Sequence, residues 1–207
     1  MNSSGILNYM SEKSHNSLYK NGKVFTKRDI NGSDAGSKGI DLNKKNIKIL
    51  DARETSQKNK ISIDKQGFEI LHSNINNLDL DFFNNKEVLD KYYSYCANFI
   101  KDRTGAKDVY AFDHNIRSAS GKKSKKMILG GQQVQGPAYI VHGDYTLTSA
   151  PDRFSQLSKP VGKNDTLRQL LGKSGSLLSP DTVNETLRNG RFAIINLWRN
   201  IVQDPVE

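Results

Sequence analysis

The sequence predicts a domain that is mainly β with added helices, the α+β class. Several apolar segments rich in β-branched and aromatic residues alternate with polar turns, as strands do. Residues 84–102 instead follow the 3.6-residue period of an amphipathic helix. Residues 149–188 carry the start and stop signals of short helices. These three observations predict a strand-rich core with one packing helix near 84–102 and a helical insertion over 149–188.

Composition and charge narrow the class of protein. The chain has 207 residues, 35% of them hydrophobic and 26% charged, a globular composition without the roughly 18-residue apolar run of a membrane span. The formal charge of +9 raises the question of nucleic acid, but the lysines are spread along the chain. The one dense group, Lys122–Lys126, has no interleaved aromatic residues and predicts a solvated loop tip. Nucleic acid is therefore not the expected partner.

The first part of the chain predicts little regular structure. Residues 1–45 are rich in Asn, Lys, Ser and Gly, and we expect a polar, weakly ordered N-terminal arm followed by a domain over 46–207. Short alternating segments predict the first strands of that domain, at 47–51, 61–63 and 67–71. Residues 1–5 lack a basic stretch followed by an apolar one, and Cys96 is a single cysteine. We therefore expect a cytoplasmic protein without disulfides.

The helix at 84–102 has the clearest pattern in the sequence. Val88, Tyr92, Cys96 and Phe99 lie on one stripe, and Thr104-Gly105 supplies a stop. Strands are expected on either side of the Lys-rich loop, over 108–117 and 137–146, and again over 191–198. Trp198 is expected in the core, and its alternative is a wall of the substrate site. Ser149 and Ser179 are the expected N-caps of two inserted helices, and Gly172 the end of a third.

A His-x-Asp pattern stands at the end of the 137–146 segment. Side chains two residues apart on a strand point to the same face, so His142 and Asp144 offer an imidazole and a carboxylate to one ion. These donors suit non-haem Fe(II), whose usual protein set is two histidines and one carboxylate. The alternative is a surface histidine beside a turn aspartate.

Four more residues are candidates for a site. His114, next to Asp113, is a further ligand or a polar group lining the same cavity, or else a satisfied structural histidine. Arg117, Asn196 and Arg199 interrupt apolar segments, where they are placed to meet the carboxylates of a substrate or cosubstrate. Their alternative is a structural ion pair.

Several motifs, in constant order from about residue 47 to the end, carry a family resemblance. They are Asp51-Ala52-Arg53, Gln66-Gly67-Phe68, Thr104-Gly105-Ala106, Phe112-Asp113-His114-Asn115-Ile116-Arg117, Val141-His142-Gly143-Asp144-Tyr145-Thr146 and Arg191-Phe192-Ala193-Ile194-Ile195-Asn196-Leu197-Trp198-Arg199. In these the chain resembles the fungal and bacterial hydroxylase/desaturase family. That family includes gibberellin-desaturase-like proteins and the CmcJ-type component of cephem methoxylation.

The resemblance implies a double-stranded β-helix, or jelly roll, that uses Fe(II) and 2-oxoglutarate to activate dioxygen. By similarity, His142 and Asp144 would be the first two iron ligands. From their own placement in the sequence, Arg117 and His114 are the candidates for catalysis, and Asn196 and Arg199 are the candidates for binding the cosubstrate. The family's third ligand is a distal histidine, and no histidine follows His142 here. The resemblance thus implies that the C-terminal strands and the third ligand are missing from this chain.

The function implied is hydroxylation or desaturation of a small molecule of the secondary-metabolite kind. Its partners would be that substrate, 2-oxoglutarate and dioxygen, with no membrane. Two alternatives stay open at this point: a non-catalytic jelly-roll subunit that assists another enzyme in a homo- or hetero-oligomer, and a basic protein associated with nucleic acid.

Overall fold

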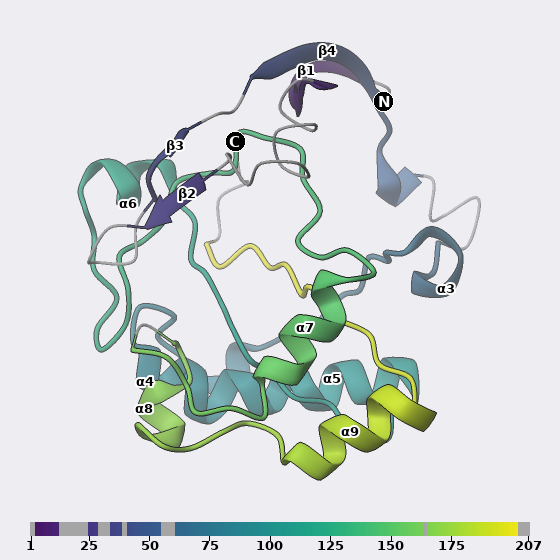
Figure 1. The fold of residues 1–207 in the computed structure, drawn as a ribbon. Coiled ribbons are helices and arrows are strands. Elements are labelled where there is room, and N and C mark those ends of the chain that lie inside the picture. Colours follow the sequence, from purple (N-terminus) through teal and green to yellow (C-terminus); the bar gives the residue numbers. More distant parts are fainter. Residues whose placement is uncertain are drawn as a thin grey trace. The chain divides into compact units, whose positions relative to one another are not determined.

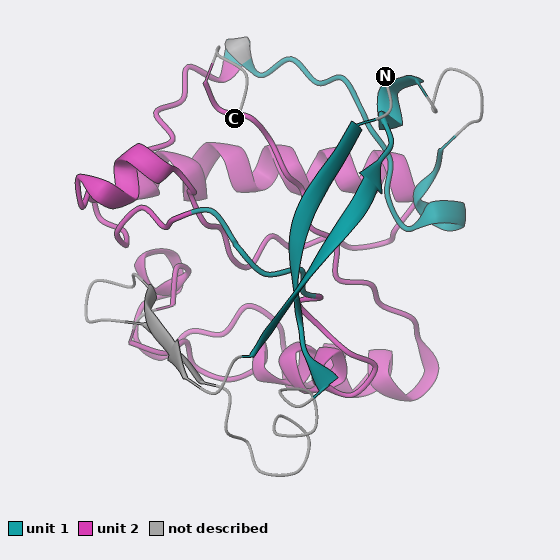
Figure 2. Ribbon diagram, turned by 90° about the horizontal axis from the view of Figure 1, so that it is seen from above, with its two compact units in different colours: residues 1–28, 34–77, 137–142 teal, residues 29–33, 78–136, 143–207 magenta. Residues whose placement is uncertain are grey.

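The computed structural model describes residues 3–12, 25–28, 34–38, 41–54, 61–163 and 165–202. The chain divides into two compact units, shown in different colours in Figure 2. The first unit comprises residues 1–28, 34–77 and 137–142, and the second comprises 29–33, 78–136 and 143–207. Each unit therefore contains segments that are distant in the sequence.

Two small antiparallel sheets belong to the first unit. β1 (Ser3–Met10) pairs with β4 (Leu42–Ile49) along its whole length, from Ser3 opposite Ile49 to Met10 opposite Leu42. β2 (Phe25–Arg28) pairs with β3 (Asp34–Lys38). β1 and the start of β4 fall within the segment expected to be a weakly ordered arm, and much of the rest of that segment lies outside the described residues.

One helical run provides the framework of the second unit. It begins with α4 (Asn85–Glu87), continues through the π-helical segment η2 (Val88–Tyr92) and ends with α5 (Tyr93–Thr104), as Figure 1 shows. Gly105 follows with a φ of 67°, a left-handed conformation that glycine adopts without steric cost. The predicted helix at 84–102 and its stop are thus confirmed.

The core of this unit forms on that helical run. Val88, Leu89 and Tyr93 are buried together with Leu167, which comes much later in the sequence. A second cluster joins Ile116, Ile128 and Val134. The first cluster buries the apolar stripe of the helix, which is how an amphipathic helix gains most of its stability.

The predicted helical insertion is also present. It contains α7 (Ser149–Gln156), α8 (Arg168–Leu171) and α9 (Pro180–Asn189), and α7 packs beside α9 (Figure 1). Ser179 caps α9 by accepting a hydrogen bond from the Thr182 amide, as predicted, and Gly172 ends α8. The cap predicted at Ser149 is wrong. The N-cap of α7 is Thr148, and the Ser149 hydroxyl accepts a bond from the Thr146 amide instead.

Most of the predicted strands do not form. Residues 63–66 are the short helix α3 (Ile63–Gln66), and the segments 67–71, 108–117, 137–146 and 191–198 belong to no sheet among the described residues. In these parts of the chain the structure has only isolated β-bridges, such as Arg117 with Gln135 and Asn84 with Leu129, instead of continuous strand pairing. Part of the Lys-rich group likewise lies in a short helix, α6 (Ala119–Lys123), and η1 (Asn76–Leu78) is a 3₁₀ turn.

The fold is therefore a mixed α/β structure with small antiparallel sheets, less rich in strands than predicted. The physical reason is that an apolar β-prone segment becomes a strand only when another segment satisfies its backbone groups. The prediction for Trp198 is wrong too, because its side chain is 76% exposed rather than in the core.

Candidate functional site

His142 lies at the end of a segment that runs beside β1 in the first unit. The Val141 amide donates to the Asn8 carbonyl at 2.8 Å, and the Asn8 side-chain amide donates to the Tyr139 carbonyl at 2.8 Å. The Nδ1 of His142 is 2.7 Å from the Ile140 carbonyl oxygen. A carbonyl only accepts, so Nδ1 is the donor in this contact. A histidine whose Nδ1–H is held by a backbone carbonyl is oriented to ligate a metal through Nε2.

Asp144 belongs to the second unit, in an irregular segment before α7. Its Oδ2 accepts a hydrogen bond from the side-chain amide of Asn196, which is 52 residues further along the chain. Two predicted site residues are thereby brought together. The partner of Asn196 is the candidate metal ligand itself, whereas the sequence had suggested a cosubstrate.

Arg199, three residues after Asn196, is tied to the helical run. Its Nε donates to the Tyr92 hydroxyl at 3.1 Å, and the Tyr92 ring meets Phe82 edge-on with centroids 5.0 Å apart. Burial, with a smaller effect of the nearby Cys96, raises the pKa of Tyr92 to about 12, so its hydroxyl stays protonated at neutral pH. Cys96 is half-buried, and burial raises the pKa of its thiol, as expected for a packing residue.

Arg117 makes a different contact. Its Nη1 donates to the Gly136 carbonyl at 2.9 Å, beside the bridge that joins Arg117 to Gln135. The guanidinium thus helps hold the 132–136 segment against the segment 113–118. The described contacts of Arg117 and of Asn196 lie in different parts of the second unit.

His114 is paired with a core tyrosine. Its Nδ1 is 2.9 Å from the Tyr93 hydroxyl, and the two rings meet edge-on. Burial lowers the pKa of His114, and Asp113 opposes this only in part. The imidazole is therefore neutral at pH 7. Since burial also raises the pKa of Tyr93, the phenol keeps its proton and has one to donate.

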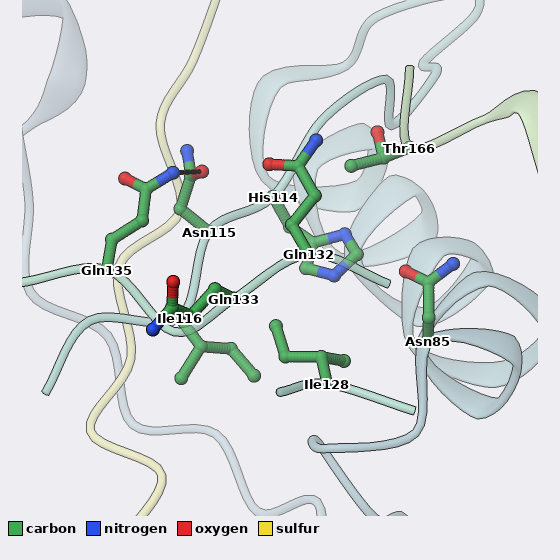
Figure 3. Close-up of a pocket in the computed structure, with 9 residues that line it drawn as sticks. All are labelled: Asn85, His114, Asn115, Ile116, Ile128, Gln132, Gln133, Gln135 and Thr166. Atoms are coloured by element: carbon green, nitrogen blue, oxygen red, sulfur yellow. Dashed lines mark hydrogen bonds between the residues drawn. The ribbon is translucent and has the colours of Figure 1, made fainter. Parts of the chain in front are cut away.

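A small hollow opens at His114 (Figure 3). Its lining combines carboxamides, one hydroxyl, one imidazole and two isoleucines: Asn85, His114, Asn115, Ile116, Ile128, Gln132, Gln133, Gln135 and Thr166. Gln135 donates to the Asn115 side-chain oxygen at 2.7 Å, and Asn85 donates to Gln169 at 2.7 Å. The sequence interpretation missed these amides, although the run Gln132-Gln133-Val134-Gln135 was a visible clue.

The donor groups that an iron ion would need are incomplete among the described residues. Across the described ranges, no group of three His, Cys, Asp or Glu side chains is close enough to hold a metal ion. His142 and Asp144 nevertheless each have the supporting hydrogen bond that ligands usually have, a carbonyl behind the imidazole and an amide on the carboxylate. The described residues therefore supply two donors of the right chemical type, one in each unit, but no set of three. None of the described helices has the length and apolar character that spanning a membrane requires.

Comparison with known proteins gives the family. Residues 7–207 match the family described as oxidoreductase/YMDC permease-like domain. A protein of Methylophilus leisingeri, named only for its place in the dcmA 3′ region, is 41% identical over 196 residues, which are 94% of this chain and 89% of that protein. No solved structure matches.

Two fungal relatives have functional names. The alpha-ketoglutarate-dependent dioxygenase phiK of a fungal species is 33% identical over 177 residues, 83% of this chain and 52% of that protein. The hydroxylase/desaturase efuI of Hormonema carpetanum is 25% identical over 177 residues, 83% of this chain and 51% of that protein. The chain thus spans about half the length of these fungal relatives, and the predicted resemblance to hydroxylases and desaturases is confirmed. It belongs to the oxidoreductase/YMDC permease-like domain family.

Proposed function

We propose that this chain carries part of the active site of a non-haem Fe(II)/2-oxoglutarate-dependent oxygenase that hydroxylates or desaturates a small organic molecule. The observation that supports it most is the alignment with a named alpha-ketoglutarate-dependent dioxygenase over 83% of the chain, which includes a His-x-Asp pair with suitable supporting bonds. The jelly-roll core, the division into an arm (1–45) and an oxygenase domain (46–207), and a cytoplasmic location belong to the same proposal.

In this proposal His142 and Asp144 hold the iron, and the third protein ligand lies outside the described residues. Bound Fe(II) with 2-oxoglutarate would supply the activation of dioxygen needed to attack an unactivated C–H bond. His142 contributes through Nε2, because its Nδ1 proton is engaged with the Ile140 carbonyl. Asp144 contributes the negative charge that stabilises a divalent cation.

The remaining candidates are proposed to orient organic groups. Arg199 and Arg117 offer guanidinium groups, which pair with carboxylates in a bidentate manner. We assign Arg199 to a carboxylate of the cosubstrate and Arg117 to the substrate, while Asn196 donates to Asp144. His114, neutral and half-buried, is proposed to donate or accept a hydrogen bond at the hollow of Figure 3 rather than to carry charge.

The test is an anaerobic titration of the protein with Fe(II) and 2-oxoglutarate. The expected result is the weak visible charge-transfer absorption of the ternary complex, and its loss in His142→Ala and in Asp144→Ala with an unchanged circular dichroism spectrum. If His142→Ala binds Fe(II) as well as the parent protein, the metal assignment is wrong.

The same titration addresses the alternative of a non-catalytic subunit. The incomplete ligand set among the described residues favours that alternative. Failure of the parent protein to bind Fe(II), combined with a stable complex with another polypeptide, would support it over catalysis.

A further inference from the structure

The hollow at His114 (Figure 3) is formed entirely by residues of the second unit. Three of its carboxamide residues are buried, since Asn85, Gln133 and Gln135 are 3%, 6% and 2% exposed. Ile116 and Ile128, which also line the hollow, belong to the second core cluster. The hollow is therefore part of the packed core of this unit and not a space between exposed loops.

Gln133 differs from the other two buried carboxamides. Asn85 donates to Gln169 and Gln135 donates to Asn115. The Gln133 side chain has no hydrogen-bond partner among the described residues, although no fully buried side-chain nitrogen or oxygen there lacks one. Solvent therefore reaches the Gln133 carboxamide through the small exposed fraction of this residue. Because a buried amide without a partner costs free energy, this group favours any molecule that can pair with it.

The size and charge of the hollow limit what can enter it. About 10 Å³ is available to the centre of a water-sized group, which is room for one such group. No Asp, Glu, Lys or Arg side chain lines the hollow. The nearby Asp113 accepts from the Thr166 hydroxyl and the His114 amide, and it is not a lining residue. An ionised group in the hollow would lose hydration without meeting an opposite charge, so the occupant should be uncharged.

We infer that this hollow is a subsite for the hydroxyl group of an uncharged small molecule. A hydroxyl has the size of one water and both donates and accepts, which matches the N–H donors and carbonyl acceptor of the Gln133 carboxamide. Ile116 and Ile128 supply apolar surface for the carbon that bears the hydroxyl. The inference deepens the proposed function and rests on it only in taking an organic molecule as the substrate. It involves no metal ion.

The experiment titrates the isotope-labelled 207-residue chain with benzyl alcohol and follows its NMR spectrum. We expect saturable shifts at the Ile116 and Ile128 methyl groups and at the Gln133 side-chain amide, because the aromatic ring of the probe would lie close to them. Benzylammonium and benzoate carry the same ring with a charge, and they should bind at least about tenfold more weakly. Metal and 2-oxoglutarate are left out, so the result does not depend on iron binding.

Gln133→Met is the informative substitution, because methionine has nearly the same length and cannot replace the carboxamide hydrogen bonds. It should weaken the binding of benzyl alcohol by about three- to tenfold, the usual effect of one neutral hydrogen bond. Gln156→Met is the matched control. It makes the same replacement at an exposed glutamine at the end of α7, and it should keep the parent affinity.

Three outcomes would overturn the inference. Equal affinity for the three probes would show that the ring alone binds, and parent-like binding by Gln133→Met would remove the role of the carboxamide. Absence of saturable shifts in the parent protein would show that the hollow holds only water. None of these results bears on the Fe(II) titration, which tests the proposed function separately. If Gln133→Met does not fold, the comparison of the three probes on the parent protein decides.

Discussion

At the scale of the residue, the pair of His114 and Tyr93 is the most informative feature. The two side chains are hydrogen-bonded to each other, although they are 21 residues apart in the sequence. Both are titratable, and burial favours the neutral form of each. Tyr93 anchors the pair in the core, whereas the imidazole reaches the hollow of Figure 3. The protonation state of His114 is therefore coupled to the stability of the second unit.

This coupling predicts a pH dependence of stability. Burial lowers the pKa of His114 below its ordinary value of 6.5. As the pH falls through that value, the unfolded chain takes up a proton that the folded protein still rejects. The free energy of unfolding should therefore decrease below about pH 6.5.

Urea unfolding at pH 8 and at pH 5.5 measures the effect. His114→Gln should lose less stability than the parent protein between these two pH values, although it is less stable at pH 8 because the bond to Tyr93 changes. Equal losses in both proteins would show that His114 is not the group responsible.

The phenol of the same pair gives a second prediction. Tyr93→Phe keeps the buried ring and removes the hydroxyl, so the free energy of unfolding should fall by about 1 kcal/mol, the usual net value of one hydrogen bond. Thermal or urea unfolding at pH 8 measures it. An unchanged free energy of unfolding would mean that water replaces the hydrogen bond at His114.

At the scale of the element, short helices depend on their caps and on one or two buried side chains. α8 is a single turn and α9 has 10 residues, so both helices are too short to be stable alone. Leu167, at the start of α8, is only 1% exposed and packs with Val88, Leu89 and Tyr93. α8 is therefore held mainly by burial, and the start of α9 by its cap.

Leu167→Ala should be strongly destabilising. It leaves a cavity in the main core cluster, for which the free energy of unfolding usually falls by about 2–5 kcal/mol. Leu170→Ala is the control from the same helix. Its side chain is 53% exposed, and the expected loss is within about 0.5 kcal/mol. Chemical denaturation distinguishes the two, and similar losses would contradict the core assignment.

Ser179→Ala should remove the cap of α9. The Ser179 hydroxyl accepts from the Thr182 amide, and loss of such a cap lowers the free energy of unfolding by about 1 kcal/mol. Thr148→Ala tests the corresponding position of α7, where the side chain makes no cap bond, and should cost less. The comparison fails if Thr148→Ala is the more destabilising change.

At the scale of the whole molecule, each unit leaves large apolar side chains exposed. In the second unit these include Trp198 and Val202, both in the segment 191–202, and several residues elsewhere on the chain, such as Tyr110 and Leu129. A β-prone segment outside any described sheet, with an exposed tryptophan, favours association with another strand.

We therefore expect the protein to self-associate with rising concentration. Sedimentation velocity should show larger species, and the emission of Trp198, the single tryptophan of the chain, should shift to shorter wavelength as its ring becomes buried. Trp198→Ala should weaken association by at least about tenfold, as removal of an aromatic anchor does. Leu147→Ala, at a side chain that is 97% exposed, is the control. A monomer at all concentrations would contradict the expectation.

Local sequence determined the features that depend on neighbouring residues. The 3.6-residue period predicted a helix over 84–102, and the structure has the helical run over 85–104. Ser179 with Pro180 marked the start of α9, and Gly105 and Gly172 marked two helix ends. The motif series also predicted the family, because a series of motifs in constant order is far more specific than one His-x-Asp pair.

Tertiary structure alone decided the features that join distant residues. The bond from Asn196 to Asp144 spans 52 residues, and nothing in either neighbourhood predicts it. The same holds for the strands: among the described residues the β-prone segments at 108–117 and 191–198 stay outside sheets, whereas residues 3–10, in the part expected to be a weakly ordered arm, pair with 42–49. A helix satisfies its backbone hydrogen bonds within its own segment, but a strand depends on whichever segment the fold brings beside it.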